Sequence, residues 1–196
     1  MRNFKVKGIG VMISEFFCYI LVAARFCQRL AAAKLITFAL VAVTVSPIVL
    51  KKTQSSSAAK RPVLMVLGDS LVAGHGLPQG EAFPDILGQM LNDDGIDVRI
   101  INAGVSGDTT AGGLARLDWS LADNPDAVII VLGGNDLLRG LNPSASYANL
   151  DKIIERLKAR NIAVLLAGMQ APRNLGSDYA DEFDAIYKKL VIRHKI

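Results

Sequence analysis

Cysteine and histidine are scarce in this chain of 196 residues, which contains two of each. Both cysteines, Cys18 and Cys27, precede residue 61, so the rest of the sequence has no thiol for a disulfide framework or a cysteine zinc site. His75 and His194 are far apart in the sequence and form no ligand pair. These absences argue against a transition-metal site, and we expect neither a metal nor a cofactor.

Three common motifs are also missing. No Gly-Lys-Ser/Thr occurs, which excludes the phosphate loop of the usual nucleotide hydrolases. The nucleophile elbow Gly-x-Ser-x-Gly fails around Ser70 because Val72 stands in place of the second glycine. Gly74-His75-Gly76 resembles the start of a dinucleotide fingerprint, but Gln79 occupies the position of the third glycine.

Charge is divided unevenly along the chain. Residues 1–61 hold ten Lys and Arg against Glu15 alone, whereas residues 62–196 hold twelve against seventeen Asp and Glu. The basic character therefore belongs to the first segment, and the mildly acidic remainder is a poor match for a nucleic-acid-binding groove.

Two apolar stretches occupy the first segment, residues 8–24 and residues 35–50. The second is shorter than the roughly 20 residues of a spanning helix and longer than the h-region of about 7 to 15 residues in a signal peptide. Arg25 and Arg29 in front of it favour a cytoplasmic amino-terminal side, which would send the following chain outward.

We therefore expect residues 1–50 to be a hydrophobic leader, either a signal peptide or a membrane anchor, and residues 51–61 to be a linker. The protein is expected to be periplasmic or exported. If the leader is not cleaved, residues 35–50 would anchor the protein in the inner membrane. Translation from Met12 rather than Met1 is a further alternative.

Residues 62–196 alternate strand and helix patterns. Short apolar runs of strand length recur at residues 63–67, 98–101, 127–132 and 163–167, and are typical of fully buried parallel strands. Amphipathic helical patterns lie between and after them, with apolar faces at Phe83, Ile86, Leu87, Met90 and Leu91; at Tyr147, Leu150, Ile153, Ile154 and Leu157; and at Tyr179, Phe183, Ile186, Tyr187 and Leu190. Asn142 and Pro143 suit the N-cap and first position of the middle helix. The sequence predicts an α/β fold with an open parallel sheet covered on both faces.

Polar, glycine-rich segments follow three of the predicted strands: Gly68-Asp69-Ser70, Asn102 to Thr109, and Gly133-Gly134-Asn135-Asp136. In open parallel sheets ligands bind beyond the carboxyl ends of the strands, so these segments are expected to form one site.

The residue types in this site suit acyl transfer. Ser70 offers a hydroxyl nucleophile at a strand-to-helix turn, and the N–H groups of Ser70 and Gly107 with the side-chain amide of Asn135 could bind an oxyanion. Taken singly, each residue has a structural explanation: Ser70 as an N-cap, Gly107 as a turn former and Asn135 as an Asx-turn residue. Taken together on one sheet edge, they favour the catalytic interpretation.

Other side chains at this edge are predicted to be structural. Asp69, Asp108 and Asp136 are expected to bond loop backbone, and Trp119 is expected to pack. An acyl pocket could be lined by apolar side chains, although ordinary packing is the preferred interpretation for them: Leu77, Phe83, Leu137, Leu138 and Leu141.

The three segments resemble the sequence blocks of the GDSL or SGNH hydrolases, and Gly107 to Leu117 is similar to bacterial arylesterases and acyl-CoA thioesterase/lysophospholipases. The resemblance implies Ser70 as nucleophile and Ser70, Gly107 and Asn135 as the oxyanion hole. It also implies a three-layer, flavodoxin-like strand order, no metal, a periplasmic location, and hydrolysis of short acyl esters, aryl esters, acyl thioesters or lysophospholipids.

The family's last block, Asp-x-x-His, has no counterpart in this sequence, because Val191 stands three residues before His194. We therefore expect the last strand and helix of the fold to be truncated and the activity to be impaired, since the general base is unknown. His75 is interpreted as a loop residue lining the cleft, with a role as base as the alternative. His194 is interpreted as a solvated residue at a helix end.

Other functions stay open. One is a non-catalytic, membrane-tethered acyl-binding module or truncated pseudoenzyme, and another is a polysaccharide deacetylase of the same fold. Neither implies a nucleic-acid partner.

Overall fold

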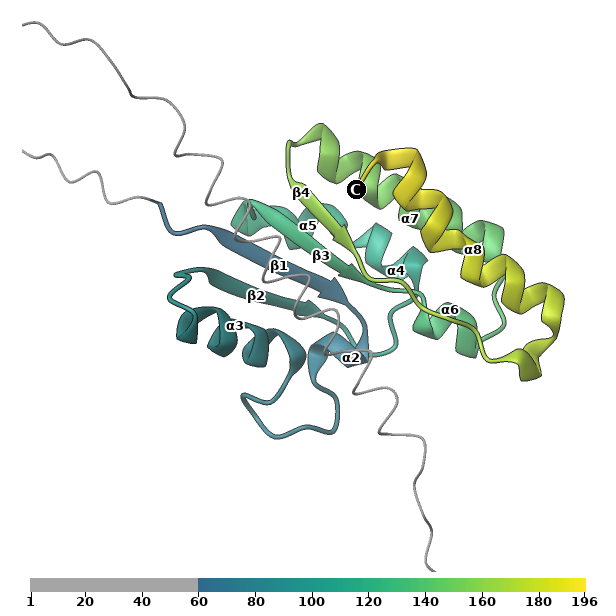
Figure 1. Ribbon diagram of the computed structural model, residues 1–196, viewed down its shortest axis with the longest axis horizontal. Helices are drawn as coiled ribbons and strands as arrows, with labels where there is room; N and C mark the ends of the chain where they lie inside the picture. Colours follow the sequence, from purple (N-terminus) through teal and green to yellow (C-terminus); the bar gives the residue numbers. More distant parts are fainter. Residues whose placement is uncertain (1–59) are drawn as a thin grey trace, which may run out of the picture. The chain divides into compact units, whose positions relative to one another are not determined.

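The computed structural model describes residues 60–196 (Figure 1). Its elements in chain order are β1 (Val63–Gly68), α2 (Ser70–Ala73), α3 (Phe83–Asp93), β2 (Arg99–Gly104), α4 (Thr110–Ala115), α5 (Leu117–Ser120), the 3-10 turn η1 (Leu121–Asp123), β3 (Ala127–Val131), α6 (Gly134–Leu138), α7 (Pro143–Ala159), β4 (Ala163–Leu166), the 3-10 turn η2 (Arg173–Leu175) and α8 (Ser177–His194). The predicted leader over residues 1–50 and nearly all of the predicted linker lie outside the described residues.

The four strands form one parallel sheet in the order β2-β1-β3-β4. This is the flavodoxin-like order that the resemblance to the GDSL or SGNH hydrolases implies. The central strands β1 and β3 are buried along their whole length, as predicted. The same prediction is wrong for β2 and β4, which lie at the sheet edges and are partly exposed.

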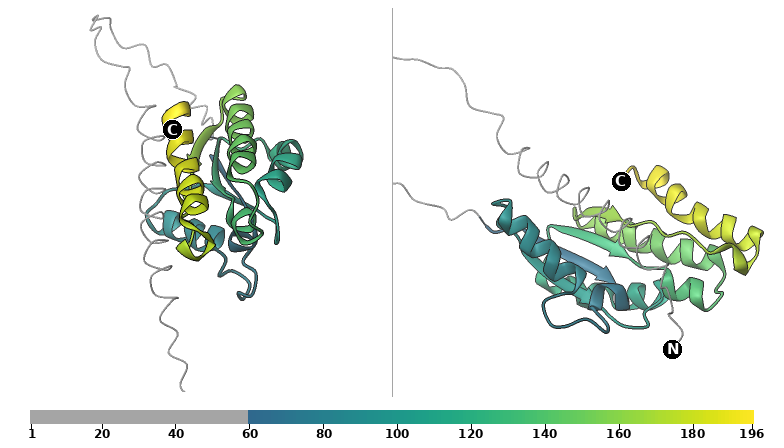
Figure 2. Two further views of the ribbon diagram at one scale, coloured as in Figure 1. Left: turned by 90° about the vertical axis from the view of Figure 1, so that its right-hand side faces the viewer. Right: turned by 60° about the horizontal axis from the view of Figure 1, so that its bottom comes forward.

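Helices cover both faces of the sheet (Figure 2). On one face, alternate residues of β1 and β3, such as Met65 and Ile130, share a core with apolar residues of α5, α7 and α8. On the other face α3 packs against β2, where Gly88 brings the helix backbone close to Ile100. The three-layer architecture follows because strand side chains alternate between the faces.

Helix α7 begins where the sequence predicts. The Asn142 side chain accepts a 2.9 Å hydrogen bond from the N–H of Ser144, and Pro143 occupies the first helical position. The cap satisfies one of the N–H groups that a helix start leaves unpaired, and proline there has no N–H to lose.

Two of the glycine-rich segments are more regular than predicted. Strand β2 continues through Asn102 to Gly104, so the loop begins only at Val105. A Cβ atom on Gly104 would lie 2.2 Å from the backbone nitrogen of Ala73, so only glycine lets the end of β2 approach α2 this closely. In the third segment, Gly134 and Asn135 form the first turn of α6.

Trp119 lies on the surface of α5. Its side chain is 81% exposed, so the prediction that it packs is wrong. Among the helices of residues 60–196, none combines the length and apolar character needed to cross a bilayer.

Candidate active site

Ser70 lies two residues beyond the carboxyl end of β1 and is the first residue of α2. The preceding Asp69 is buried and caps this helix, since its Oδ1 accepts the N–H of Leu71 at 3.0 Å. The alternative role of Ser70 as N-cap is therefore wrong. Because Asp69 takes the N–H of Leu71, the cap leaves the N–H of Ser70 for another acceptor.

Gly107 lies in a tight turn after β2. The N–H of Asp108 donates to the carbonyl of Val105 at 3.1 Å, and Gly107 occupies the third turn position with φ of +84°. A positive φ at this position is typical of a type II turn and favours glycine. The N–H of Gly107 takes no part in the turn's own hydrogen bond, while its carbonyl accepts from Arg139 Nη2 at 2.9 Å.

Asn135 connects the other two segments. Its Nδ2 donates to the backbone carbonyl of Asp108 at 2.8 Å and approaches Oδ2 of Asp69 at 3.4 Å. These partners adjoin Gly107 and Ser70, so the structure brings the three predicted site residues to one edge of the sheet. The alternative of a local Asx turn at Asn135 is wrong, since both contacts are with distant segments.

Asp136 is structural, as predicted. Its carboxylate is 1% exposed and accepts from the N–H and Oγ1 of Thr110, at 2.8 and 2.6 Å, and from Ser146 Oγ at 2.8 Å. It thereby ties α4 and α7 to α6. Thr110 and Ser146 carry no sequence signal of this role, because the contacts join segments that are distant in the chain.

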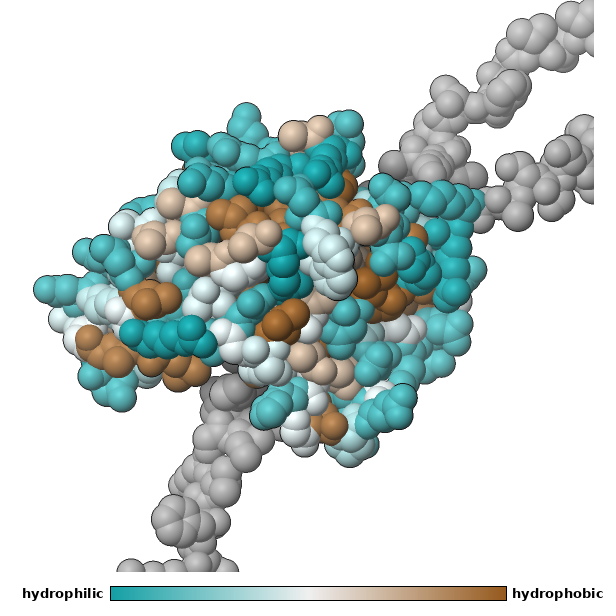
Figure 3. Space-filling model, turned by 180° about the vertical axis from the view of Figure 1, so that it is seen from behind, coloured by the Kyte–Doolittle hydropathy of each residue, from teal (hydrophilic) through white to brown (hydrophobic). Residues whose placement is uncertain are grey.

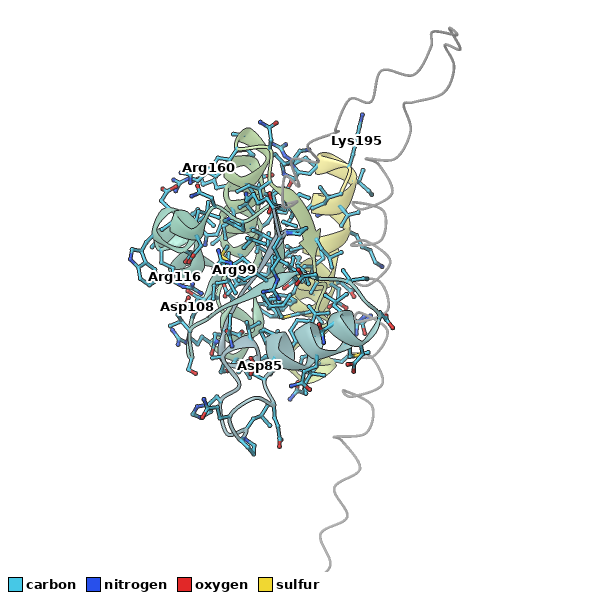
Figure 4. All side chains as sticks on the ribbon, turned by 90° about the vertical axis from the view of Figure 1, so that its left-hand side faces the viewer. Asp85, Arg99, Asp108, Arg116, Arg160 and Lys195 are labelled. Atoms are coloured by element: carbon cyan, nitrogen blue, oxygen red, sulfur yellow. The ribbon has the colours of Figure 1, made fainter. Side chains whose placement is uncertain are left out.

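Asp108 is structural as well, but its carboxylate pairs with the side chain of Arg116, which sequence reasoning missed, and not with loop backbone as predicted. Oδ2 of Asp108 pairs with Arg116 Nε at 2.6 Å, and Figure 4 shows the two side chains next to each other. Nothing in a single sequence distinguishes Arg116 from the other arginines of the domain, although it belongs to the segment that resembles the bacterial esterases.

Burial raises the pKa of Asp69 above its ordinary value of 3.8. The hydrogen bond from Leu71 N–H opposes the shift, and the negative charges of Asp108 and Asp136 add to it.

The two histidines lie in different places. His75 is exposed in the loop after α2, and its backbone N–H donates to the carbonyl of Ser70 at 3.1 Å. His194, at the end of α8, is only 8% exposed, and its Nε2 lies 2.6 Å from Oδ1 of Asp151 on α7. The prediction of a solvated His194 is therefore wrong.

His194 is remote from Ser70. It borders a cavity of about 480 Å³ together with Glu155, Lys158 and Arg193. Since α7 ends just before β4 begins, this cavity lies at the amino-terminal edge of the strands, opposite the edge that carries Ser70.

Apolar side chains are exposed around the Ser70 edge. Leu138 is 83% exposed after Asn135, and Leu77 and Leu141 are exposed on neighbouring loops. Packing is therefore the wrong interpretation for these three, whereas Leu137 does pack against the core. On the face seen in Figure 3, hydrophobic residues form separate patches among hydrophilic ones.

Among residues 60–196, no group of three or more His, Cys, Asp or Glu side chains is placed so that it could hold a metal ion. The site instead offers a hydroxyl and N–H donors from three segments at the carboxyl edge of a parallel sheet. These are the groups that acyl transfer from an ester requires.

Residues 66–196 match the GDSL-like Lipase/Acylhydrolase family, and the chain belongs to this family. It is 41% identical over 144 residues to "Esterase TesA" of Pseudomonas aeruginosa, covering 73% of this chain and 70% of that protein. It is 40% identical over 134 residues to "Thioesterase 1/protease 1/lysophospholipase L1" of Escherichia coli K12, covering 68% of this chain and 63% of that protein. The crystal structure of AlinE4, an SGNH-hydrolase family esterase, has a TM-score of 0.68 and 50% identity, covering 71% of this chain and 75% of that one.

Proposed function

We propose that Ser70 is the nucleophile of an SGNH-type ester hydrolase. Its Oγ attacks the substrate carbonyl carbon, the carbonyl becomes an oxyanion, and the alcohol or thiol leaves as the acyl group is bonded to Oγ. Water then releases the acid and restores the hydroxyl. Ser70 is partly exposed at the sheet edge, which gives a substrate access to the hydroxyl.

The oxyanion hole in this proposal consists of the N–H groups of Ser70 and Gly107 and the Nδ2 amide of Asn135. The observation that carries the proposal is the pair of contacts at Asn135. One amide hydrogen is held by the carbonyl of Asp108 at 2.8 Å, while the 3.4 Å approach to Asp69 is long for a hydrogen bond. The second hydrogen makes only this long bond to Asp69, which an oxyanion acceptor would replace, and the first bond fixes its direction.

The proposed substrates are short acyl or aryl esters, acyl thioesters and lysophospholipids. The names of two relatives support this range: the P. aeruginosa protein is called an esterase, and the E. coli protein is called a thioesterase and lysophospholipase. The exposed Leu138, Leu77 and Leu141 provide apolar surface at the same edge for an acyl chain.

We propose further that this 196-residue chain turns over slowly. A serine hydroxyl is a weak nucleophile without an adjacent base, and the sequence has no Asp-x-x-His. His194 lies at the opposite edge, and within residues 60–196 no side-chain hydrogen bond joins His75 to Ser70. Loss of the base in a serine hydrolase costs on the order of 10⁶ in kcat and leaves a residual acceleration of about 10³ to 10⁴ over water.

The second candidate function is that of a non-catalytic acyl-binding module. Two observations favour it. The exposed leucines around the site offer apolar surface to an acyl chain, and His194 is buried against Asp151, far from Ser70, where it cannot serve as the base. This module would bind a fatty acid equally well after Ser70→Ala.

For localisation we propose export, with residues 1–50 acting as a signal peptide or an inner-membrane anchor. The apolar stretch at residues 35–50 and the basic residues before it support this. A fusion of residues 1–61 to alkaline phosphatase tests it, since that reporter is active only outside the cytoplasm.

The function is tested by hydrolysis of p-nitrophenyl acetate by the folded 196-residue chain, with Ser70→Ala and His75→Ala measured in parallel. We expect slow turnover that Ser70→Ala abolishes and that His75→Ala leaves unchanged. Equal rates for the wild type and Ser70→Ala would contradict the serine mechanism in this chain. Fatty-acid binding that survives Ser70→Ala would then favour the acyl-binding module.

A further inference from the structure

Arg116 gathers four acceptors around one guanidinium group. Its Nε pairs with Asp108 Oδ2 at 2.6 Å, and its Nη1 donates to Ser120 Oγ at 3.1 Å. Its Nη2 donates to two backbone carbonyls, those of Gly68 at 3.0 Å and Ala103 at 2.9 Å. The side chain is only 17% exposed, so these contacts are largely shielded from water.

Two of these acceptors are carbonyls at the carboxyl ends of neighbouring strands. Gly68 is the last residue of β1 and stands two positions before Ser70. Ala103 lies in β2, which leads into the turn that carries Gly107. One nitrogen of Arg116 therefore bridges the exits of the two strands, in addition to the strand pairing and to the bond from the Val105 N–H to the Gly68 carbonyl at 3.0 Å.

The carboxylate partner extends the connection to the third donor. Asp108 follows Gly107 directly, and its own carbonyl accepts the side-chain amide of Asn135. A shift of Asp108 would move both the Gly107 peptide and the acceptor that orients Asn135.

We propose that Arg116 is the positioning residue that holds the three oxyanion donors in place relative to one another. It acts through Gly68, Ala103 and Asp108 and touches no reacting atom. This inference rests on the proposed function, in which the N–H groups of Ser70 and Gly107 and the amide of Asn135 bind the oxyanion.

The chemistry of the site requires arginine in particular. A guanidinium is planar and presents several donors in a fixed fork, whereas a lysine ammonium is one compact charge on a flexible stem. Lysine at position 116 can keep the ion pair with Asp108, but it cannot hold Ser120 and both carbonyls at once.

The variants for the test are Arg116→Lys and Arg116→Met, with Arg99→Met as the matched control. Arg99 also pairs with an aspartate, Asp123, at 3.1 Å, but at the start of β2, away from the site. Two readouts are needed: kcat and KM for p-nitrophenyl acetate after subtraction of the Ser70→Ala rate, and the NMR resonances of the Gly107 amide and the Asn135 side-chain amide.

We expect Arg116→Met and Arg116→Lys to lower the Ser70-dependent kcat while KM stays within about twofold. A displacement of about 1 Å at a reacting centre costs on the order of 10²-fold in rate, which sets the upper end of the loss. The Gly107 and Asn135 resonances should shift in both variants, and Arg99→Met should change neither readout.

The inference is overturned if Arg116→Lys, correctly folded, keeps the wild-type kcat, or if the two resonances stay in place in both variants. It is also overturned if KM rises while kcat is unchanged. If the wild type is no faster than Ser70→Ala, the proposed function fails on its own, and the resonances alone then decide whether Arg116 positions these groups. Arg116→Lys decides the matter if Arg116→Met does not fold.

Discussion

The side-chain amide of Asn135 donates to the backbone carbonyl of Asp108 at 2.8 Å, which joins helix α6 to the turn containing Gly107. This bond spans the end of β3 and the loop after β2. It orients an amide whose second hydrogen points toward the Ser70 side of the site, where Asp69 Oδ2 lies 3.4 Å away.

Asn135→Ala removes one proposed oxyanion donor. Loss of such a donor typically lowers kcat by about 10² to 10³, because the hydrogen bond strengthens as charge develops on the oxygen. Steady-state kinetics should show this loss in the Ser70-dependent rate with little change in KM. Asn149→Ala is the control, since the Asn149 amide bonds Thr110 Oγ1 at 3.1 Å outside the proposed hole, and an equal loss there would contradict the assignment.

Gly107→Ala and Gly76→Ala separate backbone strain from function. Both glycines have positive φ, +84° and +79°, and neither has an atom so close that a Cβ would clash. Each substitution should lower the free energy of unfolding by roughly 1 to 2 kcal/mol, measured in urea, because L residues resist this conformation. Only Gly107→Ala should also lower the Ser70-dependent rate; a similar rate loss in Gly76→Ala would remove the special role of Gly107.

Asp136→Asn should destabilise the fold strongly. The buried carboxylate accepts three hydrogen bonds, and an amide in its place turns a donor toward Thr110 or Ser146. We expect the free energy of unfolding to fall by about 3 kcal/mol, in the range seen when a buried charged network is broken. The free energy of unfolding of Asp85→Asn, at an exposed position, should stay within about 0.5 kcal/mol of the wild type. An equally small change in Asp136→Asn would show that the Asp136 network contributes little to stability.

Asp69 should give stability an unusual pH dependence. Its pKa is raised in the folded chain, so as the pH rises above 3.8 the unfolded chain loses this proton first and unfolding becomes more favourable. The contribution of Asp69 to stability therefore falls with rising pH, across the window from 3.8 up to the raised pKa. Asn remains a good N-cap but does not titrate.

The measurement for Asp69 is the free energy of unfolding of Asp69→Asn minus that of the wild type, as a function of pH. This difference should increase through the window above 3.8 and then level off. A difference that decreases would mean that the folded state lowers the pKa of Asp69. Asp93→Asn, an exposed position at the end of α3, provides the baseline.

Much of the fold was predictable from local patterns. Continuous apolar runs marked β1 and β3, and the Asn142-Pro143 pair marked the start of α7, because these signals act over a few neighbouring residues. The end of β2 was not predictable, since Asn102, Ala103 and Gly104 have low strand propensity and are extended only through pairing with β1. The helices α4, α5 and α6 are too short for a hydrophobic period to show.

The residue types of the site could be predicted, but the contacts that hold these residues in place could not. Glycine at position 107 and asparagine at 135 stand out in a sequence because few other residues supply a positive φ or an amide donor. The contacts of Arg116 and the bond between Thr110 and Asp136 join distant segments, so only the folded chain reveals them. The exposure of Trp119 and the partner of His194 could not be predicted for the same reason.

The central claim, that Ser70 is the nucleophile, is tested most directly by a p-nitrophenyl alkylphosphonate. Ser70 Oγ bonds to phosphorus, p-nitrophenolate leaves, and the serine proton passes to the buffer, so a stoichiometric adduct accumulates even when turnover is slow. Peptide mass spectrometry of the 196-residue chain should place the adduct on Ser70 and find none in Ser70→Ala. Absence of the adduct, or its appearance on another serine such as Ser106 with Ser70 unmodified, would contradict the account.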